Sequence, residues 1–323
     1  MKDKAIKISP SLSISLTDVC NLKCVYCPPY GENFVKCKEM CSIDSILNLI
    51  HIMQQYDIPV IRMTGGEPLL FPERVEAILK TCVECSVKKI ILNTNGVHVF
   101  ENLKWLEKYK DSFLLKISLD AVEEELYDEI TKSKAQYSKV IKSIEEAVKR
   151  GFKIEVNTVI TTKNIDYVWD VIQFAIDRNM DIKLFGMNDF EGKVDSQGLY
   201  VSLENLINRL EHDYVKCENE RLPGNRGIEM HKYKDENGNQ ILVVEHKTFR
   251  KSNGKKIYSE FCKNCKNYPC STGLFSITLR ADGLLQTCRM RPEEGYSIKN
   301  AKINEIDAIV TKILEPYQKC FFI

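Results

Sequence analysis

The most informative stretch of this sequence is Ser15-Leu16-Thr17-Asp18-Val19-Cys20-Asn21-Leu22-Lys23-Cys24-Val25-Tyr26-Cys27. It follows a short β-type run and contains three cysteines in the pattern Cys-x3-Cys-x2-Cys. Three thiolates in one loop suit a soft metal centre, which is either zinc or an iron–sulfur cluster. Zinc requires a fourth Cys or His to close a tetrahedral site, and none is adjacent. The spacing therefore favours an iron–sulfur cluster with one iron open to a small molecule.

Strand-like and helix-like segments alternate around this loop. The β-type runs are Leu12–Leu16, Val60–Met63, Lys89–Leu92, Phe113–Leu119, Lys153–Ile160 and Ile182–Phe185. Segments with helical periodicity separate them, at Ile43–Tyr56, Arg74–Cys85, Asn102–Tyr109, Tyr137–Arg150 and Tyr167–Asn179. This alternation is typical of βαβ units and a parallel sheet. Six repeats in about 190 residues predict an α/β fold, an incomplete (β/α)6 TIM-like barrel whose functional loops follow the carboxyl ends of its strands.

The alternation fades after about residue 189, where a different region begins. Leu203–Cys217 has the pattern of a polar helix, and Gln240–Glu245 that of a strand. Asn237-Gly238-Asn239, just before that strand, is a hairpin signal. We therefore predict a barrel domain over residues 1–200 and a small cysteine-bearing module over residues 201–323.

Composition narrows the class of protein. The chain has 323 residues, 44% of them hydrophobic and 28% charged, and its net charge of +1 does not favour nucleic-acid binding. No apolar run approaches the roughly 18 residues of a membrane span, and the N-terminus lacks the apolar core of a signal peptide. We expect a cytoplasmic protein with neither nucleic acid nor membrane as a partner. In that compartment its 13 cysteines indicate metal or redox chemistry rather than disulfides.

A second group of cysteines lies near the C-terminus, as Cys262-x2-Cys265-x4-Cys270 followed by Cys288. The turn signal Ala281-Asp282-Gly283 predicts a hairpin that returns Cys288 towards the other three. Four thiolates with no histidine nearby fit either a structural zinc or an iron–sulfur cluster. Taken alone, this group favours zinc.

With these motifs the sequence resembles the radical S-adenosylmethionine (SAM) superfamily, whose signature is Cys-x3-Cys-x2-Cys after the first strand. Three further motifs match it in order at strand ends, namely Thr64-Gly65-Gly66-Glu67-Pro68, Asn93-Thr94-Asn95-Gly96 and Ser118-Leu119-Asp120. The resemblance implies that Cys20, Cys24 and Cys27 hold a [4Fe-4S] cluster that binds SAM. An electron from a flavodoxin- or ferredoxin-type donor would then cleave SAM to a 5′-deoxyadenosyl radical.

The same resemblance implies residues that bind SAM. Gly65 and Gly66 would let the backbone approach its methionine moiety, and Glu67 would accept a hydrogen bond from its ammonium group. Ser118 and Asn95 would bind its carboxylate or ribose, with capping of a strand end as the alternative for both. Further implied contacts are Tyr26, Lys183 and Met187.

Within the superfamily the chain resembles the GTP 3′,8-cyclases and related enzymes with a SPASM/Twitch-type C-terminal module. The shared segments are Ile61–Leu69, Ile117–Ala121 and the C-terminal cysteine motif. In that family these cysteines bind an auxiliary [4Fe-4S] cluster, so the resemblance implies such a cluster on Cys262, Cys265 and Cys288. Cys270 would close its last iron, or is a spare buried thiol.

The sequence also departs from the cyclases. Ser13 replaces a cyclase arginine, and Glu155 replaces a lysine that holds substrate phosphates. A glutamate there would repel a triphosphate, so GTP is a poor prediction for the substrate. The charged side chains expected to face the cavity are Arg62, Lys183 and Arg289.

These patterns predict an enzyme, of oxidoreductase or lyase type. It would abstract hydrogen from a small-molecule substrate derived from a nucleoside or an amino acid, and would use the auxiliary cluster in a later redox or bond-forming step. The alternatives are a maturase that modifies a ribosomal peptide, a GTP 3′,8-cyclase, and a non-catalytic iron–sulfur protein. The oligomeric state is left open.

Overall fold

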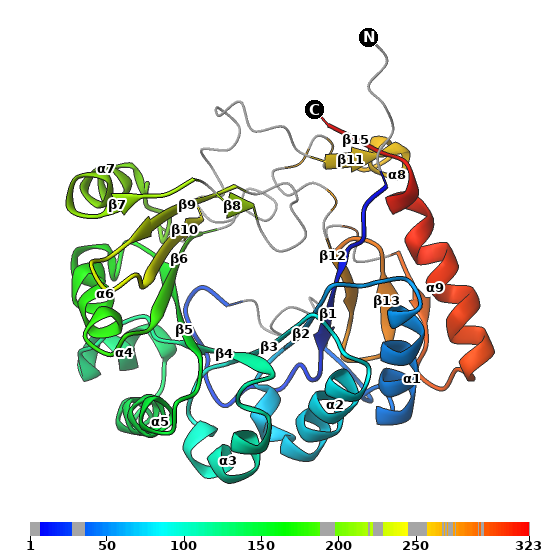
Figure 1. Cartoon of the computed structure of the whole chain (residues 1–323), viewed down its shortest axis with the longest axis horizontal. Helices are drawn as coiled ribbons and strands as arrows, with labels where there is room; N and C mark the ends of the chain where they lie inside the picture. Colours follow the sequence, from blue (N-terminus) through cyan, green and yellow to red (C-terminus); the bar gives the residue numbers. More distant parts are fainter. Residues whose placement is uncertain are drawn as a thin grey trace.

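Six parallel strands form the centre of the fold, in the order in which they occur along the chain. They are β1 (Ser11–Ser15), β2 (Val60–Thr64), β3 (Lys89–Thr94), β4 (Phe113–Ser118), β5 (Ile154–Ile160) and β6 (Asp181–Gly186). This computed structural model describes residues 7–27, 36–187, 198–218, 220–221, 229–244, 257–266, 268, 270, 274, 276–289, 291 and 294–322. In Figure 1 the strands curve into an arc with helices along its outer side. The predicted α/β fold with a parallel sheet is confirmed, and it is consistent with a partial barrel.

Helices connect consecutive strands and pack on the outer face of the arc (Figure 1). They are α1 (Ile43–Gln54), α2 (Pro72–Glu84), α3 (Val99–Leu106), α4 (Glu124–Thr131), α5 (Tyr137–Lys149) and α6 (Val168–Ile176). Short 3-10 turns are η2 (Pro68–Leu70), η3 (Glu107–Tyr109) and η4 (Ile165–Tyr167). The helix α4 was not predicted, because it is short, begins with acidic residues and buries only three side chains. In the described part of the chain, no helix is long and apolar enough to cross a membrane.

The region after residue 200 extends both edges of this sheet. At one edge, β10 (Gln240–Val244) runs parallel to β6, and the predicted hairpin joins it to β9 (Glu229–Lys234). At the other edge, β12 (Ser276–Leu279) runs parallel to β1 and turns back as β13 (Leu284–Gln286), which confirms the second predicted hairpin. The remaining elements of this region are α7 (Glu204–Asp213), β7 (Val215–Lys216), β8 (Glu220–Arg221), β11 (Ile257–Ser259), α8 (Glu260–Lys263), β14 (Tyr296–Ser297), α9 (Ile303–Gln318) and β15 (Cys320–Phe322). The division into two domains at residue 200 stays a prediction.

The two faces of the sheet differ in chemistry, because side chains alternate along a strand and in-register neighbours share a face. On the outer face apolar residues pack with the helices into one core, as in the pairs Leu12–Ile61 and Leu92–Leu115. The inner face carries polar residues at most of the alternate positions, although Val60, Ile91 and Leu114 form a small apolar cluster there. These are Ser13, Ser15, Arg62, Thr64, Asn93, Lys116, Ser118, Glu155, Asn157 and Lys183. The outer face therefore builds the core, and the inner face is the candidate functional surface.

Candidate functional site

The first cysteine group lies in the loop that leaves the carboxyl end of β1. Backbone hydrogen bonds tie this loop to the end of α4, from Lys23 N to the Thr131 carbonyl at 3.0 Å and from Val25 N to the Ile130 carbonyl at 2.9 Å. Cys20 and Cys27 are exposed and Cys24 is half-buried. The loop thus presents its thiols at the end of the sheet where a barrel enzyme carries its chemistry.

Gly65 and Gly66 are required by the close approach of their loop to the cysteine loop. Gly66 N donates to the Thr17 carbonyl at 2.7 Å, and Glu67 N donates to the Val19 carbonyl at 2.8 Å. A Cβ on Gly66 would lie 2.0 Å from the Val19 carbonyl oxygen, and one on Gly65 would lie 2.4 Å from the Thr17 carbonyl oxygen. Both glycines therefore have a structural reason that is separate from the predicted approach to SAM.

Glu67 joins the glycine loop to the end of β3. Its Oε1 accepts hydrogen bonds from Leu69 N at 2.9 Å and Thr94 Oγ1 at 2.7 Å, while Oε2 accepts from Asn95 N at 2.7 Å. The side chain is almost fully buried, and burial raises the pKa of its carboxyl group. This geometry supports a positioning role, and the hydrogen bond to the ammonium group of SAM stays a prediction.

Asn95 connects the end of β3 to Cys20. Its Nδ2 donates to Asn21 Oδ1 at 2.8 Å and lies 3.7 Å from Cys20 Sγ, which also accepts from Leu22 N at 3.4 Å. Its Oδ1 accepts from Val97 N at 3.0 Å, so the strand-end capping considered from sequence is present as well. The amide donors around Cys20 stabilise a thiolate.

The electrostatics of the thiols fit a cationic centre. Burial raises the pKa of Cys24, and negative charge on Asp120, Cys27 and Cys20 acts in the same direction. A metal centre would supply the missing positive charge. Within the described ranges, no three Cys, His, Asp or Glu groups surround a common ion position, as zinc would require. A four-iron cluster binds each thiolate through a different iron, so three thiolates from one loop fit such a cluster.

Two of the residues implied to bind SAM, Tyr26 and Met187, lie in one small apolar cluster with Leu199. The Tyr26 hydroxyl donates to Asp120 Oδ2 at 2.6 Å, and Val159 N donates to Asp120 Oδ1 at 2.8 Å. Burial raises the pKa of Asp120 to about 6, while both hydrogen bonds act against that rise. The carboxyl group of Asp120 thereby fixes the Tyr26 ring beside the cysteine loop.

Charged side chains lie on the inner face of β4, β5 and β6, nearer to the middle of these strands. Lys116 on β4 and Glu155 on β5 are in-register neighbours and form a buried ion pair. Lys183 on β6 is only 5% exposed; burial lowers its pKa to about 7, and the positive charge of Lys116 adds to this shift. Arg62 lies close enough to contribute in the same direction. Lys116 neutralises Glu155, which weakens the sequence argument from Glu155, and the expectation that GTP is a poor substrate stays a prediction.

Asn157 is a functional candidate that the sequence motifs did not indicate. It lies on β5 between Ser118 on β4 and Lys183 on β6, in register with both. Its Oδ1 is buried and, within the described part of the chain, accepts no hydrogen bond. A buried acceptor without a donor calls for an explanation, and beside Ser118 and Lys183 on the inner face a ligand could supply that donor. The only signal in the sequence was the polar alternation of Glu155 and Asn157 along β5.

Three cysteines of the second group lie on α8 or shortly after it in the chain, at 262, 265 and 270. Cys265 N donates to the Cys262 carbonyl at 2.9 Å, and burial raises the pKa of Cys262. Tyr258 donates its hydroxyl hydrogen to the Cys270 carbonyl at 2.7 Å. Cys288 follows β13, and Arg289 next to it is half-buried. The location of Arg289 at the cavity stays a prediction.

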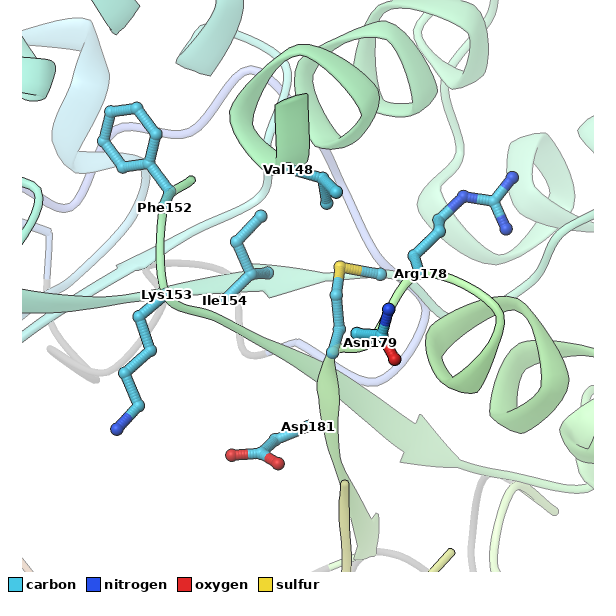
Figure 2. A pocket seen from close by; sticks show the side chains of 8 residues that line it. Val148, Phe152, Lys153, Ile154, Arg178, Asn179 and Asp181 are labelled. Carbon is cyan, nitrogen blue, oxygen red and sulfur yellow. The ribbon is translucent and has the colours of Figure 1, made fainter. Parts of the chain in front are cut away.

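A pocket of about 340 Å³ lies at the end of the strands opposite to the cysteine loop (Figure 2). It is lined by Val148, Phe152, Lys153, Ile154, Arg178, Asn179, Met180 and Asp181. Figure 2 shows Lys153 and Ile154 at the start of β5 and Asp181 at the start of β6. Because this is the amino end of the strands, the pocket is separate from the candidate site.

The chain is similar to known proteins over the segment that contains most of these residues. Residues 14–175 match the family model of the Radical SAM superfamily. The GTP 3′,8-cyclase of Aquifex aeolicus is 28% identical over 306 residues, covering 93% of this chain and 87% of the relative. The GTP 3′,8-cyclase of Clostridium perfringens is 33% identical over 196 residues, which is 60% of each chain.

Solved structures share the fold at low sequence identity. Streptococcus suis SuiB bound to precursor peptide SuiA has a TM-score of 0.66 at 15% identity, covering 96% of this chain and 68% of that protein. Native anSMEcpe with bound AdoMet has a TM-score of 0.59 at 17% identity, covering 92% and 79%. The segment that matches the family model, residues 14–175, contains the cysteine loop, the glycine loop and the polar strand ends described above as far as β5. The chain belongs to the radical SAM superfamily.

Proposed function

We propose that this protein is an enzyme that cleaves SAM reductively and abstracts hydrogen from a small molecule derived from a nucleoside or an amino acid. The observation that carries the proposal is that the cysteine loop, which leaves the carboxyl end of β1, also lies at the carboxyl end of β4, where Tyr26 of the loop donates to Asp120 at 2.6 Å. Ser118 ends β4, and Asn157 and Lys183 lie beside it in register, near the middle of β5 and β6. A SAM-sized ligand at the carboxyl ends of the strands would contact the loop and this polar row.

The roles of the chain's own groups follow from their positions. Cys20, Cys24 and Cys27 would hold the [4Fe-4S] cluster, which when bound supplies the electron that breaks the sulfonium bond. Tyr26 and Met187 would flank the adenosine of SAM. The other polar contacts would come from Gly65, Gly66, Glu67, Asn95, Ser118, Asn157 and Lys183.

Asp120 and the small apolar cluster around Tyr26 have a supporting task. The bond from the Tyr26 hydroxyl to Asp120 holds the ring in place before SAM binds, so little side-chain entropy is lost on binding. Asp120 is almost fully buried and Tyr26 is half-buried, so these two residues would shield one side of a bound SAM from water.

We further infer an auxiliary [4Fe-4S] cluster on Cys262, Cys265, Cys270 and Cys288. Four protein thiolates would leave no iron open, which suits electron transfer to or from a substrate radical better than direct binding of substrate. Two hydrogen bonds support this assignment, from Cys265 N to the Cys262 carbonyl at 2.9 Å and from the Tyr258 hydroxyl to the Cys270 carbonyl at 2.7 Å, because they hold three of the four cysteines beside β11 and α8. A flavodoxin- or ferredoxin-type protein is the proposed electron donor.

A peptide substrate is the second candidate. One observation favours it: the fold matches SuiB bound to its precursor peptide and anSMEcpe bound to the Cp18Cys peptide. GTP is a third candidate, since the two sequence relatives described above are GTP 3′,8-cyclases and Lys116 offsets the negative charge of Glu155. Small molecules remain the first choice because Lys116, Glu155 and Lys183 lie close together on the inner face, where they suit a compact polar ligand.

The test is anaerobic reconstitution with iron and sulfide, reduction with dithionite, and measurement of 5′-deoxyadenosine formed from SAM. We expect cleavage by the native chain and none by a Cys24→Ala control. Cleavage no higher than in that control would leave the non-catalytic iron–sulfur protein as the better description. Addition of GTP, free amino acids or nucleosides, and candidate precursor peptides in separate reactions then distinguishes the substrates by new product masses.

A further inference from the structure

Arg291 lies between the two segments that carry the second cysteine group. Its backbone N–H donates to the Cys288 carbonyl at 3.2 Å, so it belongs to the same turn as Cys288. Its Nη1 donates to the Phe261 carbonyl at 2.9 Å, and its guanidinium lies 4.2 Å from the centre of the Phe261 ring. Because Phe261 directly precedes Cys262, one side chain ties the turn of Cys288 to the helix of Cys262.

Further hydrogen bonds and an ion pair hold the Arg291 end of this connection in place. The Gln286 side chain is buried, and its Nε2 donates to the carbonyls of Arg291 and Glu294 at 3.2 and 3.1 Å. The Arg291 side chain is 17% exposed and its second nitrogen pairs with Glu294. A guanidinium that donates in a fixed fork and stacks on a ring loses little freedom per bond, and lysine cannot reproduce this geometry.

We propose that Arg291 is the positioning residue of the four-cysteine site: it holds the turn of Cys288 against the helix of Cys262, sets the separation of these two cysteines and brings its guanidinium to the residue that precedes Cys262. This inference rests on the auxiliary cluster of the proposed function. A cluster gains negative charge on reduction, so a nearby guanidinium favours the reduced form and raises the reduction potential. Glu294 offsets part of that charge, although it lies on the more exposed side, with its side chain 46% accessible.

The experiment compares the reconstituted full-length native protein with two variants. Arg291→Met removes the fork and the charge, and Arg291→Lys keeps the charge without the fork. The matched control is Arg209→Met, because Arg209 also stacks on a ring, that of Trp169 at 3.8 Å, and pairs with Asp213, but lies on α7. The readouts are iron per chain, iron lost to a chelator, and the potential of each cluster by redox titration with electron paramagnetic resonance.

For the native chain we expect about eight iron atoms, in two four-iron clusters. In Arg291→Met we expect faster loss of about half of the iron to the chelator. At a fixed potential, the ratio of reduced to oxidised auxiliary cluster should fall about three- to tenfold. The first cluster is the internal reference and should not change. Arg291→Lys should lose iron like Arg291→Met but keep a potential near the native one.

Two results would overturn the inference, and they differ from each other. If Arg291→Met and Arg291→Lys retain iron and potential like the native chain and Arg209→Met, Arg291 has no positioning role even though the cluster exists. About four iron atoms in the native chain would instead remove the auxiliary cluster of the proposed function. If Arg291→Met does not fold, the Arg291→Lys readouts decide alone.

Discussion

The buried ion pair of Lys116 and Glu155 gives a quantitative test of the inner face. Their side chains are 9% and 8% exposed, and each lies on the polar side of its strand. Removing one partner of a buried pair typically costs about 3–5 kcal/mol, because the other charge remains buried without compensation. With about 5–15 kcal/mol of total stability in a typical protein, such a loss is large.

The two single substitutions should differ. After Glu155→Gln, the charges near Lys116 are positive, from Arg62 and Lys89, and they add to the effect of burial on its pKa. After Lys116→Met, Glu155 still has Lys183 within range of its charge. We therefore expect Glu155→Gln to lose more free energy of unfolding than Lys116→Met. The double variant should lose less than the sum, with a coupling of about 2 kcal/mol or more.

The assay is urea unfolding followed by circular dichroism, on anaerobically reconstituted protein at pH 7. The pH dependence provides a second check on Glu155→Gln. Lys116 then has a depressed pKa in the folded state, so between that value and about 10.4 the unfolded state binds more protons and stability rises with pH. The deficit of Glu155→Gln should therefore shrink at higher pH. Equal, additive losses below about 0.5 kcal/mol would refute the structural reasoning.

Three other changes have defined outcomes. Gly66→Ala places a Cβ 2.0 Å from the Val19 carbonyl oxygen, so we expect at least half of the first-cluster iron to be lost. Gly151→Ala strains the backbone at its φ of +75° but its Cβ meets only Lys110 Nζ at 3.9 Å, so it should retain the iron and controls for strain away from the cysteine loop. Asn157→Leu removes a buried, unpaired acceptor. It should leave the fold as stable or more so while weakening SAM binding about tenfold in equilibrium dialysis, and unchanged SAM binding would contradict the site. Lys183 has its pKa lowered to about 7, so native stability should rise between about pH 7 and 10 as the unfolded state alone holds the proton. Lys183→Met should flatten that slope in urea titrations, and an unchanged slope would argue against burial of the amine.

Local patterns were sufficient to predict the six central strands. Each predicted run overlaps its strand, as Phe113–Leu119 does with β4, because β-branched and aliphatic residues bounded by turn signals specify a buried strand without reference to the rest of the chain. The helix α9 lacked such a prediction. Its buried residues Ile306, Val310, Ile313 and Tyr317 have helical spacing, but Pro316 lies inside it, and an internal proline normally argues against a helix.

Features that depend on strand register could not be predicted from the sequence. The pairing of β12 with β1 joins residues more than 260 positions apart, and no local pattern specifies that contact. The same holds for Lys116 and Glu155, which are 39 residues apart and meet only because β4 and β5 align in one register. Glu155 considered alone indicated repulsion of phosphates, whereas its register partner cancels that charge. The motif residues were placed correctly at strand ends, yet the structure supplied the tasks of Gly66 and Glu67 within the fold.

The division of the sheet into an apolar outer face and a charged inner face explains why the inner charges cannot be assigned to stability. Burial of Lys183 and of the Lys116–Glu155 pair opposes folding through desolvation, and well-packed apolar residues at such positions are often neutral or stabilising. In the part of the chain that the structure describes, the helices that connect the strands pack on the outer face, and the hydrophobic core there does not include these charged groups. These charges are buried at a net cost to stability, and they lie next to the unpaired acceptor of Asn157 on the face that leads to the cysteine loop. Such an arrangement is expected where charged groups bind and orient a ligand at the expense of stability. Replacing Lys116 and Glu155 together by Met and Leu should therefore preserve or raise the free energy of unfolding. If those charges contact the substrate, the same change should lower product formation, while substrate-free cleavage of SAM continues.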